Sequence, residues 1–335
     1  MSWVISPSPF SARRKEDVIF RLLSGLLMLA LVAFPASGEY PSKPVHIIVQ
    51  FPPGGGGDAV MRIVSQPLSQ ALGQPVVIEN RPGADGAIAA GLLLKSPADG
   101  YTLLYAGSTA LIGVPIQRKN PPYDPLKDFA PISRLGQFTS YLFSSTSVPV
   151  KTLAELVDYA RANPGKVNYG TGNFYAILMS AQLAKATGLR MVHVPYKGEA
   201  QLVPDLIAGN LQFAFLAGFS GLPHAKEGRL RVLAAVYSQR TPFAPDVPTM
   251  IEAGVPEVSV LVWAALFGPA KMPREIVDRL SREVNAVLAR IETREQLSRL
   301  SFTAEGSSPE ALSALLKEQL DLSIRAARDA GIQPE

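Results

Sequence analysis

The chain has 335 residues, of which 47% are hydrophobic and 18% charged, with a formal net charge of +4. This composition excludes a disordered chain, and the length allows two domains. There is no cysteine, which excludes a disulfide framework and any thiolate metal site. His46, His193 and His224 are far apart in the sequence and give little support for a histidine metal centre. We therefore expect no metal and no cofactor.

The first 38 residues have the order of a secretory signal peptide. A basic flank precedes an apolar run over residues 22–34, which is followed by the small residues Ala36, Ser37 and Gly38. The run is shorter than the ~20 residues that a membrane-spanning helix needs. A buried N-terminal helix is the alternative, but it leaves the basic flank unexplained. We predict cleavage near Gly38 and export to the periplasm.

Removing this segment changes the charge balance. Four basic residues, Arg13, Arg14, Lys15 and Arg21, leave together with Glu16 and Asp17, so the net charge falls from +4 to +2. No dense Lys/Arg stripe with interleaved aromatic residues remains, and we expect no nucleic-acid partner.

After the signal, short apolar runs alternate with helix-length segments. Strands are predicted at 44–51, 75–80 and 101–107, with helices over 59–72 and 84–95 between them. Strands that are apolar throughout are typical of parallel sheets covered by helices on both faces. The first half is therefore predicted to be an open α/β sheet.

A second α/β series follows a turn-rich segment at 120–128, behind which the strand predicted over 132–145 is expected to carry the chain to another lobe. Predicted helices occupy 152–163, 174–187 and 200–208, and predicted strands occupy 132–145, 167–170, 191–196 and 211–216. Residues 263–270 are predicted as a strand that crosses back, and amphipathic helices over 273–290 and 309–330 are expected to pack on the first lobe. The predicted lobes are 39–138 with 240–335, and 139–239, with a ligand cleft between them.

The segment FPPGGGGDAVMRIV, residues 51–64, joins a strand to a helix through four glycines. Glycine N–H groups can approach a ligand closely, and the start of a helix carries partial positive charge. The loop is therefore predicted to bind an anion. Asp58 is interpreted first as the helix N-cap and second as a ligand contact.

The same loop fits a dinucleotide-binding pattern. Gly54, Gly56 and Ala59 match G-x-G-x-x-A, and Glu79 stands where a ribose-binding acid would. Against an oxidoreductase stand the export signal and the lack of an acid or base set for catalysis. A secreted scaffold with a non-functional cleft is a third hypothesis.

The ordered motifs FPPGGGGD, ENRPGADGAIAA, DGYTLLYAGS and HVPYKG resemble the Bug-type receptors, the periplasmic solute-binding components of tripartite tricarboxylate transporters. The resemblance extends over nearly the whole mature chain. It implies a two-lobed periplasmic-binding-protein fold (type II-like), no catalysis, a membrane permease as partner, and a small ligand whose carboxylate is held by glycine-rich loops. We expect the protein to be a monomer.

The resemblance also implies the site. In the first lobe the matching residues are Phe51, Pro53, Gly54, Gly55, Gly56, Gly57, Asp58, Ala84, Ser108 and Thr109. In the second lobe the candidates come from the residues themselves, in loops at the start of predicted helices; they are Thr171, Gly172, Asn173, Phe174, Tyr175 and the secondary candidate Lys197.

The second lobe departs from the family pattern in two ways. Phe174 and Tyr175 make the rim larger and more apolar, and Leu216 replaces an acid that might receive a ligand amine. We therefore expect a ligand with one carboxylate and an apolar body, although the two aromatic residues fit a helix core almost as well. His193 is interpreted as structural, and Trp263 as packing where the chain crosses between lobes.

Overall fold

The structure is a computed structural model that describes residues 1–3 and 40–334. Its contacts separate Met1–Ser42 from Lys43–Glu335, and the architecture below is that of the second part. Apart from residues 1–3, the predicted signal peptide lies outside the described residues. Among the residues described, no helix is both long and apolar enough to cross a bilayer.

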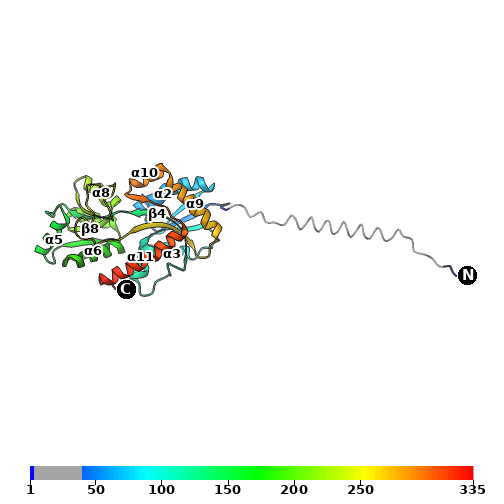
Figure 1. The fold of residues 1–335 in the computed structure, drawn as a ribbon, viewed down its shortest axis with the longest axis horizontal. Helices are drawn as coiled ribbons and strands as arrows, with labels where there is room; N and C mark the ends of the chain where they lie inside the picture. The colour runs from blue at the N-terminus through cyan, green and yellow to red at the C-terminus, as the bar shows by residue number, and fades with distance from the viewer. Residues whose placement is uncertain (4–39, 335) are drawn as a thin grey trace. The chain divides into compact units, whose positions relative to one another are not determined.

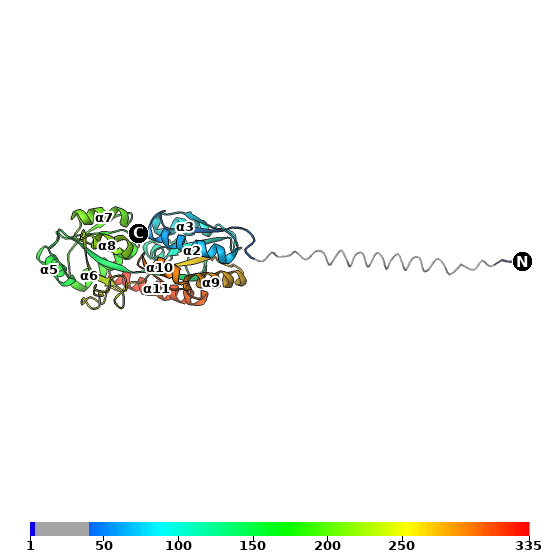
Figure 2. The same ribbon diagram turned by 90° about the horizontal axis from the view of Figure 1, so that it is seen from above.

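Two β-sheets form the centres of two lobes (Figures 1 and 2). The first sheet has the strand order β11-β4-β10-β3-β1-β2, and the second has the order β7-β6-β8-β5-β9. The strands of the first sheet are β1 (Val45–Val49), β2 (Val76–Asn80), β3 (Thr102–Gly107), β4 (Phe129–Phe138), β10 (Val262–Pro269) and β11 (Phe302–Ala304). Those of the second are β5 (Ser140–Ser145), β6 (Asn168–Thr171), β7 (Val192–Pro195), β8 (Phe213–Ala217) and β9 (Leu230–Val236).

Helices cover both sheets. Around the first sheet they are α2 (Gly56–Leu72), the short turn η1 (Ala84–Gly86), α3 (Ala87–Leu93), the π-helical turn η2 (Thr109–Gly113), α4 (Val114–Gln117), α9 (Arg274–Ala289), α10 (Ile291–Ser298) and α11 (Pro309–Asp329). Around the second they are α5 (Leu153–Ala162), α6 (Phe174–Thr187), α7 (Glu199–Ala208) and α8 (Gly218–Lys226). In α9 the apolar spacing has the expected effect, since Val277, Leu280 and Val284 are buried.

Both sheets are mixed, whereas the sequence predicted parallel strands. β1, β2 and β3 are parallel, but β10 runs antiparallel between β3 and β4. In the second sheet β5 runs antiparallel to both β8 and β9. The antiparallel strands are those next to the connections between the two lobes.

The chain crosses to the second sheet at Thr139, between β4 and β5. The turn-rich segment 120–128 itself stays in the first lobe, where Tyr123 packs in the core, and the strand predicted over 132–145 divides at Thr139 into β4 and β5. The chain returns between β9 and β10, and β10 lies wholly in the first sheet. Val262 at the start of β10 pairs with Phe138 at the end of β4.

Two segments pack in a different lobe from the one predicted. Met250, Val255 and Val258, which were assigned to the first lobe, lie in the core of the second. Helix α11 begins in the first core with Leu312, and its last turn packs Ala327 into the second core. The lobe boundaries stay a prediction, and this packing favours residue 258 over 239 as the end of the second lobe.

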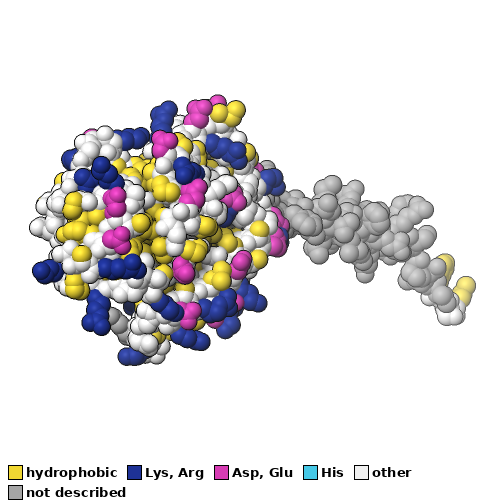
Figure 3. Space-filling model, turned by 60° about the vertical axis from the view of Figure 1, so that its left-hand side comes forward, with side chains coloured by type: hydrophobic (Ala, Val, Ile, Leu, Met, Phe, Trp, Pro, Cys, Tyr) yellow, Lys and Arg dark blue, Asp and Glu magenta, His cyan; other side chains and the backbone are white. Residues whose placement is uncertain are grey.

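On the face shown in Figure 3, acidic and basic side chains are interspersed around a centre rich in apolar side chains. Neither sign of charge forms a continuous stripe on that face.

Candidate functional site

A cavity of about 1070 Å³ lies between the two lobes. The first lobe lines it with residues 50–52, 55–57, 82–86 and 107–109, at the carboxyl ends of β1, β2 and β3. The second lobe contributes segments that follow β6, β7 and β8. Ligands of open α/β sheets bind at the carboxyl ends of the strands, and here such ends from two sheets face one another.

Helix starts surround this cavity. The first turns of α2, α6, α7 and α8 all contribute lining residues. The first N–H groups of a helix have no partner within it, and the helix dipole adds partial positive charge at that end. The cavity is therefore suited to an anionic ligand group.

Asp58 fixes the glycine loop rather than capping the helix. Helix α2 begins at Gly56 with Gly55 as N-cap, and the Asp58 carboxylate accepts from the Gly54 N–H at 2.9 Å, Arg62 Nε at 2.8 Å and Asn80 Nδ2 at 2.8 Å. Burial on its own raises the pKa of the Asp58 carboxyl, but these hydrogen bonds outweigh it and leave the pKa below its usual value.

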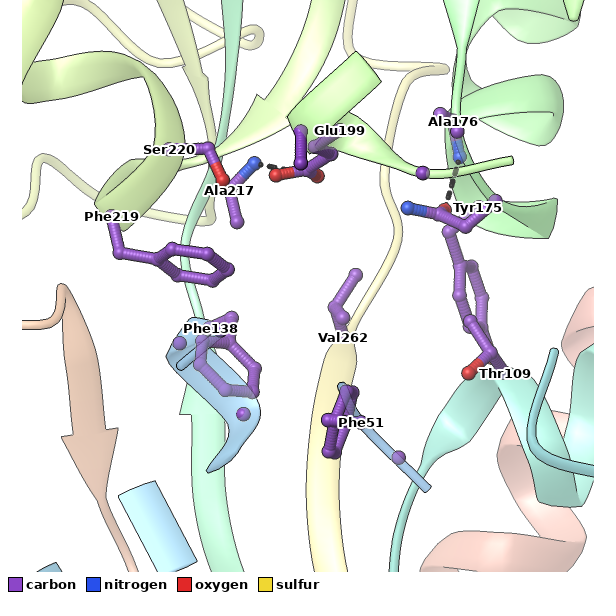
Figure 4. A pocket seen from close by; sticks show the side chains of 18 of the residues that line it. Phe51, Thr109, Phe138, Tyr175, Ala176, Glu199, Ala217, Phe219, Ser220 and Val262 are labelled. Carbon is purple, nitrogen blue, oxygen red and sulfur yellow. Dashed lines mark hydrogen bonds between the residues drawn. The ribbon is translucent and has the colours of Figure 1, made fainter. Parts of the chain in front are cut away.

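Gly56 receives an aromatic ring from the other lobe. A Cβ atom at Gly56 would lie 2.6 Å from the ring of Phe219, which follows β8. The same ring lies against Phe138, with centroids 5.6 Å apart, and Figure 4 shows both at one side of the cavity. At this position glycine is required by the close approach of the two lobes.

Among the described residues, three buried hydroxyl or indole donors line the cavity without an acceptor in hydrogen-bonding geometry: Ser108 Oγ, Tyr175 Oη and Trp263 Nε1. Ser108 and Tyr175 interact with each other, though not in the geometry of a full hydrogen bond. Burial raises the pKa of Tyr175 to about 12, so the hydroxyl keeps its proton. Buried donors normally have acceptors, and these three therefore mark a place for one.

The structure brings most of the predicted site residues to the cavity. Those that line it are Phe51, Gly55, Gly56, Gly57, Ala84, Ser108, Thr109, Gly172, Asn173, Tyr175 and Lys197. Those that do not are Pro53, Gly54, Asp58, Thr171 and Phe174.

The residues outside the lining have other partners. Phe174 is fully buried in the second core, which is the place expected if this residue packs inside the lobe and does not contact the ligand. Thr171 Oγ1 lies 2.6 Å from Nε2 of His193, which stacks on Tyr169 away from the cavity. The Gly54 N–H is used by Asp58.

Several lining residues were not predicted from the sequence, among them Gln50, Phe138, Glu199, Phe219, Ser220 and Trp263. Phe219 and Ser220 directly follow a strand, as the predicted site loops do, and that position was the available signal. Trp263 is both packed in the first core and part of the lining.

Glu79, the acid of the dinucleotide hypothesis, does not line the cavity. Its carboxylate lies 2.8 Å from His46 Nδ1 and 3.3 Å from Arg81 Nη2. The hydrogen bond to His46 lowers the pKa of Glu79, with a smaller contribution from Arg81. This acid is part of a surface ion pair.

Comparison with known proteins gives the family. The model of the tripartite tricarboxylate transporter family receptor matches residues 60–330. Protein BugT of Bordetella pertussis is 34% identical over 282 residues, covering 83% of this chain and 85% of BugT.

Solved structures agree with this match. A Rhodopseudomonas palustris protein solved with adipate has a TM-score of 0.83 and 30% identity, covering 89% of this chain and 100% of that one. The periplasmic binding protein BugD has a TM-score of 0.80 and 28% identity, covering 88% of this chain and 100% of that one. The chain therefore belongs to the tripartite tricarboxylate transporter receptor family and is a two-lobed, Bug-type periplasmic solute-binding receptor.

Proposed function

We propose that this receptor captures a small carboxylate-bearing solute in the cavity between its lobes and presents it to the membrane permease of a tripartite transporter. The family match and the adipate-bound relative support this proposal. In the same proposal the protein acts without catalysis, as a monomer, in the periplasm, after removal of residues 1–38. The first lobe comprises residues 39–138 and the C-terminal part of the chain, and the second lobe comprises the segment between them.

The observation that carries the proposal is the set of three donors without acceptors, which are Ser108 and Trp263 of the first lobe and Tyr175 of α6 in the second. A carboxylate accepts several hydrogen bonds at once, and hydrogen bonds to a charged acceptor are about twice as strong as neutral ones. Backbone N–H groups at the start of α2 lie in the same lining.

A matched pair of tyrosine variants tests this assignment. Tyr175→Phe removes a hydroxyl that has no full hydrogen bond, so we expect affinity for a carboxylate to fall about tenfold with little loss of stability. Tyr123→Phe removes a hydroxyl that donates to the Ala110 carbonyl at 2.7 Å outside the cavity. There we expect a loss of about 1 kcal/mol in stability and unchanged affinity.

Affinities are measured by calorimetry against a panel of mono-, di- and tricarboxylates, with NAD as a further ligand, and stability by urea denaturation. Equal affinity in wild type and Tyr175→Phe would remove Tyr175 from the site. A response to NAD alone would favour the oxidoreductase hypothesis instead.

A further inference from the structure

Glu199 places a carboxyl group at the second-lobe side of the cavity. It is the first residue of α7, and its Oε1 accepts a hydrogen bond from the Ala217 N–H at 3.1 Å. Ala217 is the N-cap of α8, so this N–H is one of the free donors at the start of that helix. The Glu199 carboxyl therefore occupies a place that would otherwise suit an anion from the ligand.

The other carboxyl oxygen, Oε2, is buried and has no hydrogen-bond partner of good geometry within the described residues. Ser220 is the only side chain that interacts with the carboxyl there without completing such a bond. Figure 4 shows the Glu199 carboxyl with Ala217 and Ser220 at the top of the cavity. Because Glu199 itself lines the cavity, a bound molecule can supply the missing donor.

The backbone holds Glu199 in this position. A Cβ atom at Gly172 would lie 2.8 Å from the Gly198 carbonyl carbon and 2.9 Å from the Glu199 nitrogen. The loop after β6 therefore packs directly on the start of α7, which only glycine permits.

Burial raises the pKa of the Glu199 carboxyl, and the Ser220 hydroxyl and the Ala217 N–H oppose this increase. Lys197, His224 and Arg229 are the basic residues that line the cavity. In the described part of the chain none of them forms an ion pair with Glu199, and Arg229 pairs with Glu227. The carboxyl thus lacks a cation, and its Oε2 atom lacks a donor.

We propose that Glu199 determines specificity at the far end of the ligand by accepting a hydrogen bond from a protonated amine and by excluding a second carboxylate. This rests on the proposed function, in which Ser108, Tyr175 and Trp263 hold one carboxylate. This proposal replaces the expectation, drawn from Leu216, that no acid is available to a ligand amine. Leu216 is buried in the second core, whereas Glu199, on helix α7, accepts a hydrogen bond from the N–H of the next residue, Ala217.

The order of the groups that line the cavity defines the ligand class. In Figure 4 Tyr175 and Thr109 lie at the right of the cavity, Glu199 lies at the top, Val262 lies between them and Phe51 lies at the bottom. Apolar contact in the middle suits methylene groups. The inferred ligand is an ω-amino carboxylate: a carboxylate, an aliphatic body and a terminal ammonium.

A chain-matched ligand series tests this inference. Hexanoate, 6-aminohexanoate and adipate differ only in the far end, which is a methyl, an ammonium or a second carboxylate. By calorimetry at pH 7 we expect wild type to bind 6-aminohexanoate at least about tenfold tighter than hexanoate, with adipate weakest. Glu199→Gln keeps the acceptor for Ala217 but loses the charge, so it should lose the preference for the amine. Glu199→Ala, which frees the Ala217 N–H, should gain affinity for adipate.

Glu257→Gln is the control, because it neutralises an exposed glutamate outside the cavity. Wild type that binds adipate as tightly as 6-aminohexanoate would overturn the inference and assign the far end to Lys197 and Arg229. The inference would also be overturned if both Glu199 variants bound the three ligands in the same order of affinity as wild type. If no carboxylate of this series or of the wider panel binds wild type or variants, the proposed function itself fails.

The amine preference should also depend on pH. Since ionised Glu199 is the acceptor, affinity for 6-aminohexanoate should fall as pH decreases through the raised pKa of this carboxyl, while affinity for hexanoate should not. A pH dependence that persists in Glu199→Gln would count against the proposal.

Discussion

At the scale of single residues, Asp58 combines burial with three hydrogen bonds to its charged form. Asp58→Asn keeps the shape but loses the charge and turns one oxygen into a donor, so we expect the free energy of unfolding to fall by about 2 kcal/mol at pH 7. The folded pKa is below the unfolded value of 3.8. The stabilisation is therefore full above that value and lost as pH falls through the folded pKa.

Urea denaturation at pH 7 and at pH 3 measures this difference, which should be smaller at pH 3. The exposed Asp246 gives the control, Asp246→Asn, which should change stability at neither pH. An equal loss for Asp58→Asn at both values would show that packing, and not ionisation, is the cause.

Local sequence signals predicted the loop residues of the site but not all of its chemistry. The glycine run, Ser108 and Thr109 were found because they follow apolar strands and precede helices. Glu199 was not found, because its role depends on the start of α7 meeting the start of α8, and nothing in the sequence near residue 199 indicates that contact. Asp58 was predicted as the N-cap, but the helix begins two residues earlier, at Gly56. The sequence did not indicate this start, because glycine is a poor helix former.

At the scale of elements, the start of α2 and the ring of Phe219 form one interlobe contact. Gly56→Val would place a branched side chain where the Phe219 ring lies, since even a Cβ atom would be 2.6 Å away. We expect ligand affinity to fall at least about tenfold by calorimetry, with the thermal transition retained.

Gly91→Val on α3 is the control, because a Cβ atom there meets no atom within 4 Å. Adding Phe219→Ala to Gly56→Val removes the clash and should recover part of the affinity. Unchanged binding by Gly56→Val alone would mean that this contact has no part in ligand capture.

Elements with strong end signals were predicted closely. Helix α6 has the predicted bounds 174–187, and its N-cap Asn173 accepts from the Ala176 N–H. Helix α8 and strand β11 were not predicted: α8 contains glycine and proline, and β11 has three residues held by pairing with β4. Such elements depend on tertiary contacts and leave little local signal.

At the scale of the whole molecule, α11 connects the two cores. Its Ala327 side chain is 2% exposed and packs in the second core, although the helix begins in the first. Ala327→Arg would force a long charged side chain into this contact, and we expect a loss of at least about 2 kcal/mol in urea denaturation together with weaker ligand binding. Arg328→Ala, at the exposed neighbour, should change neither property. Full stability in Ala327→Arg would mean that the end of α11 does not hold the lobes together.

The two-lobed plan followed from alternating strands and helices and from the ordered motifs. The packing of α11 and of Met250, Val255 and Val258 did not, because an amphipathic pattern shows which face is buried but not which lobe covers it.

The pairing of Phe138 with Val262 gives the molecule a defined mechanical axis. The chain leaves the first sheet on one strand and re-enters it on the hydrogen-bonded neighbour, so the connections between the lobes begin as a paired ribbon two strands wide, beside the packed end of α11. A paired ribbon resists stretching and sliding of its strands but bends easily across its plane. Rotation of one lobe against the other is therefore expected to follow a single direction, in which the two sides of the cavity separate together and a ligand held at both ends loses both contacts at once.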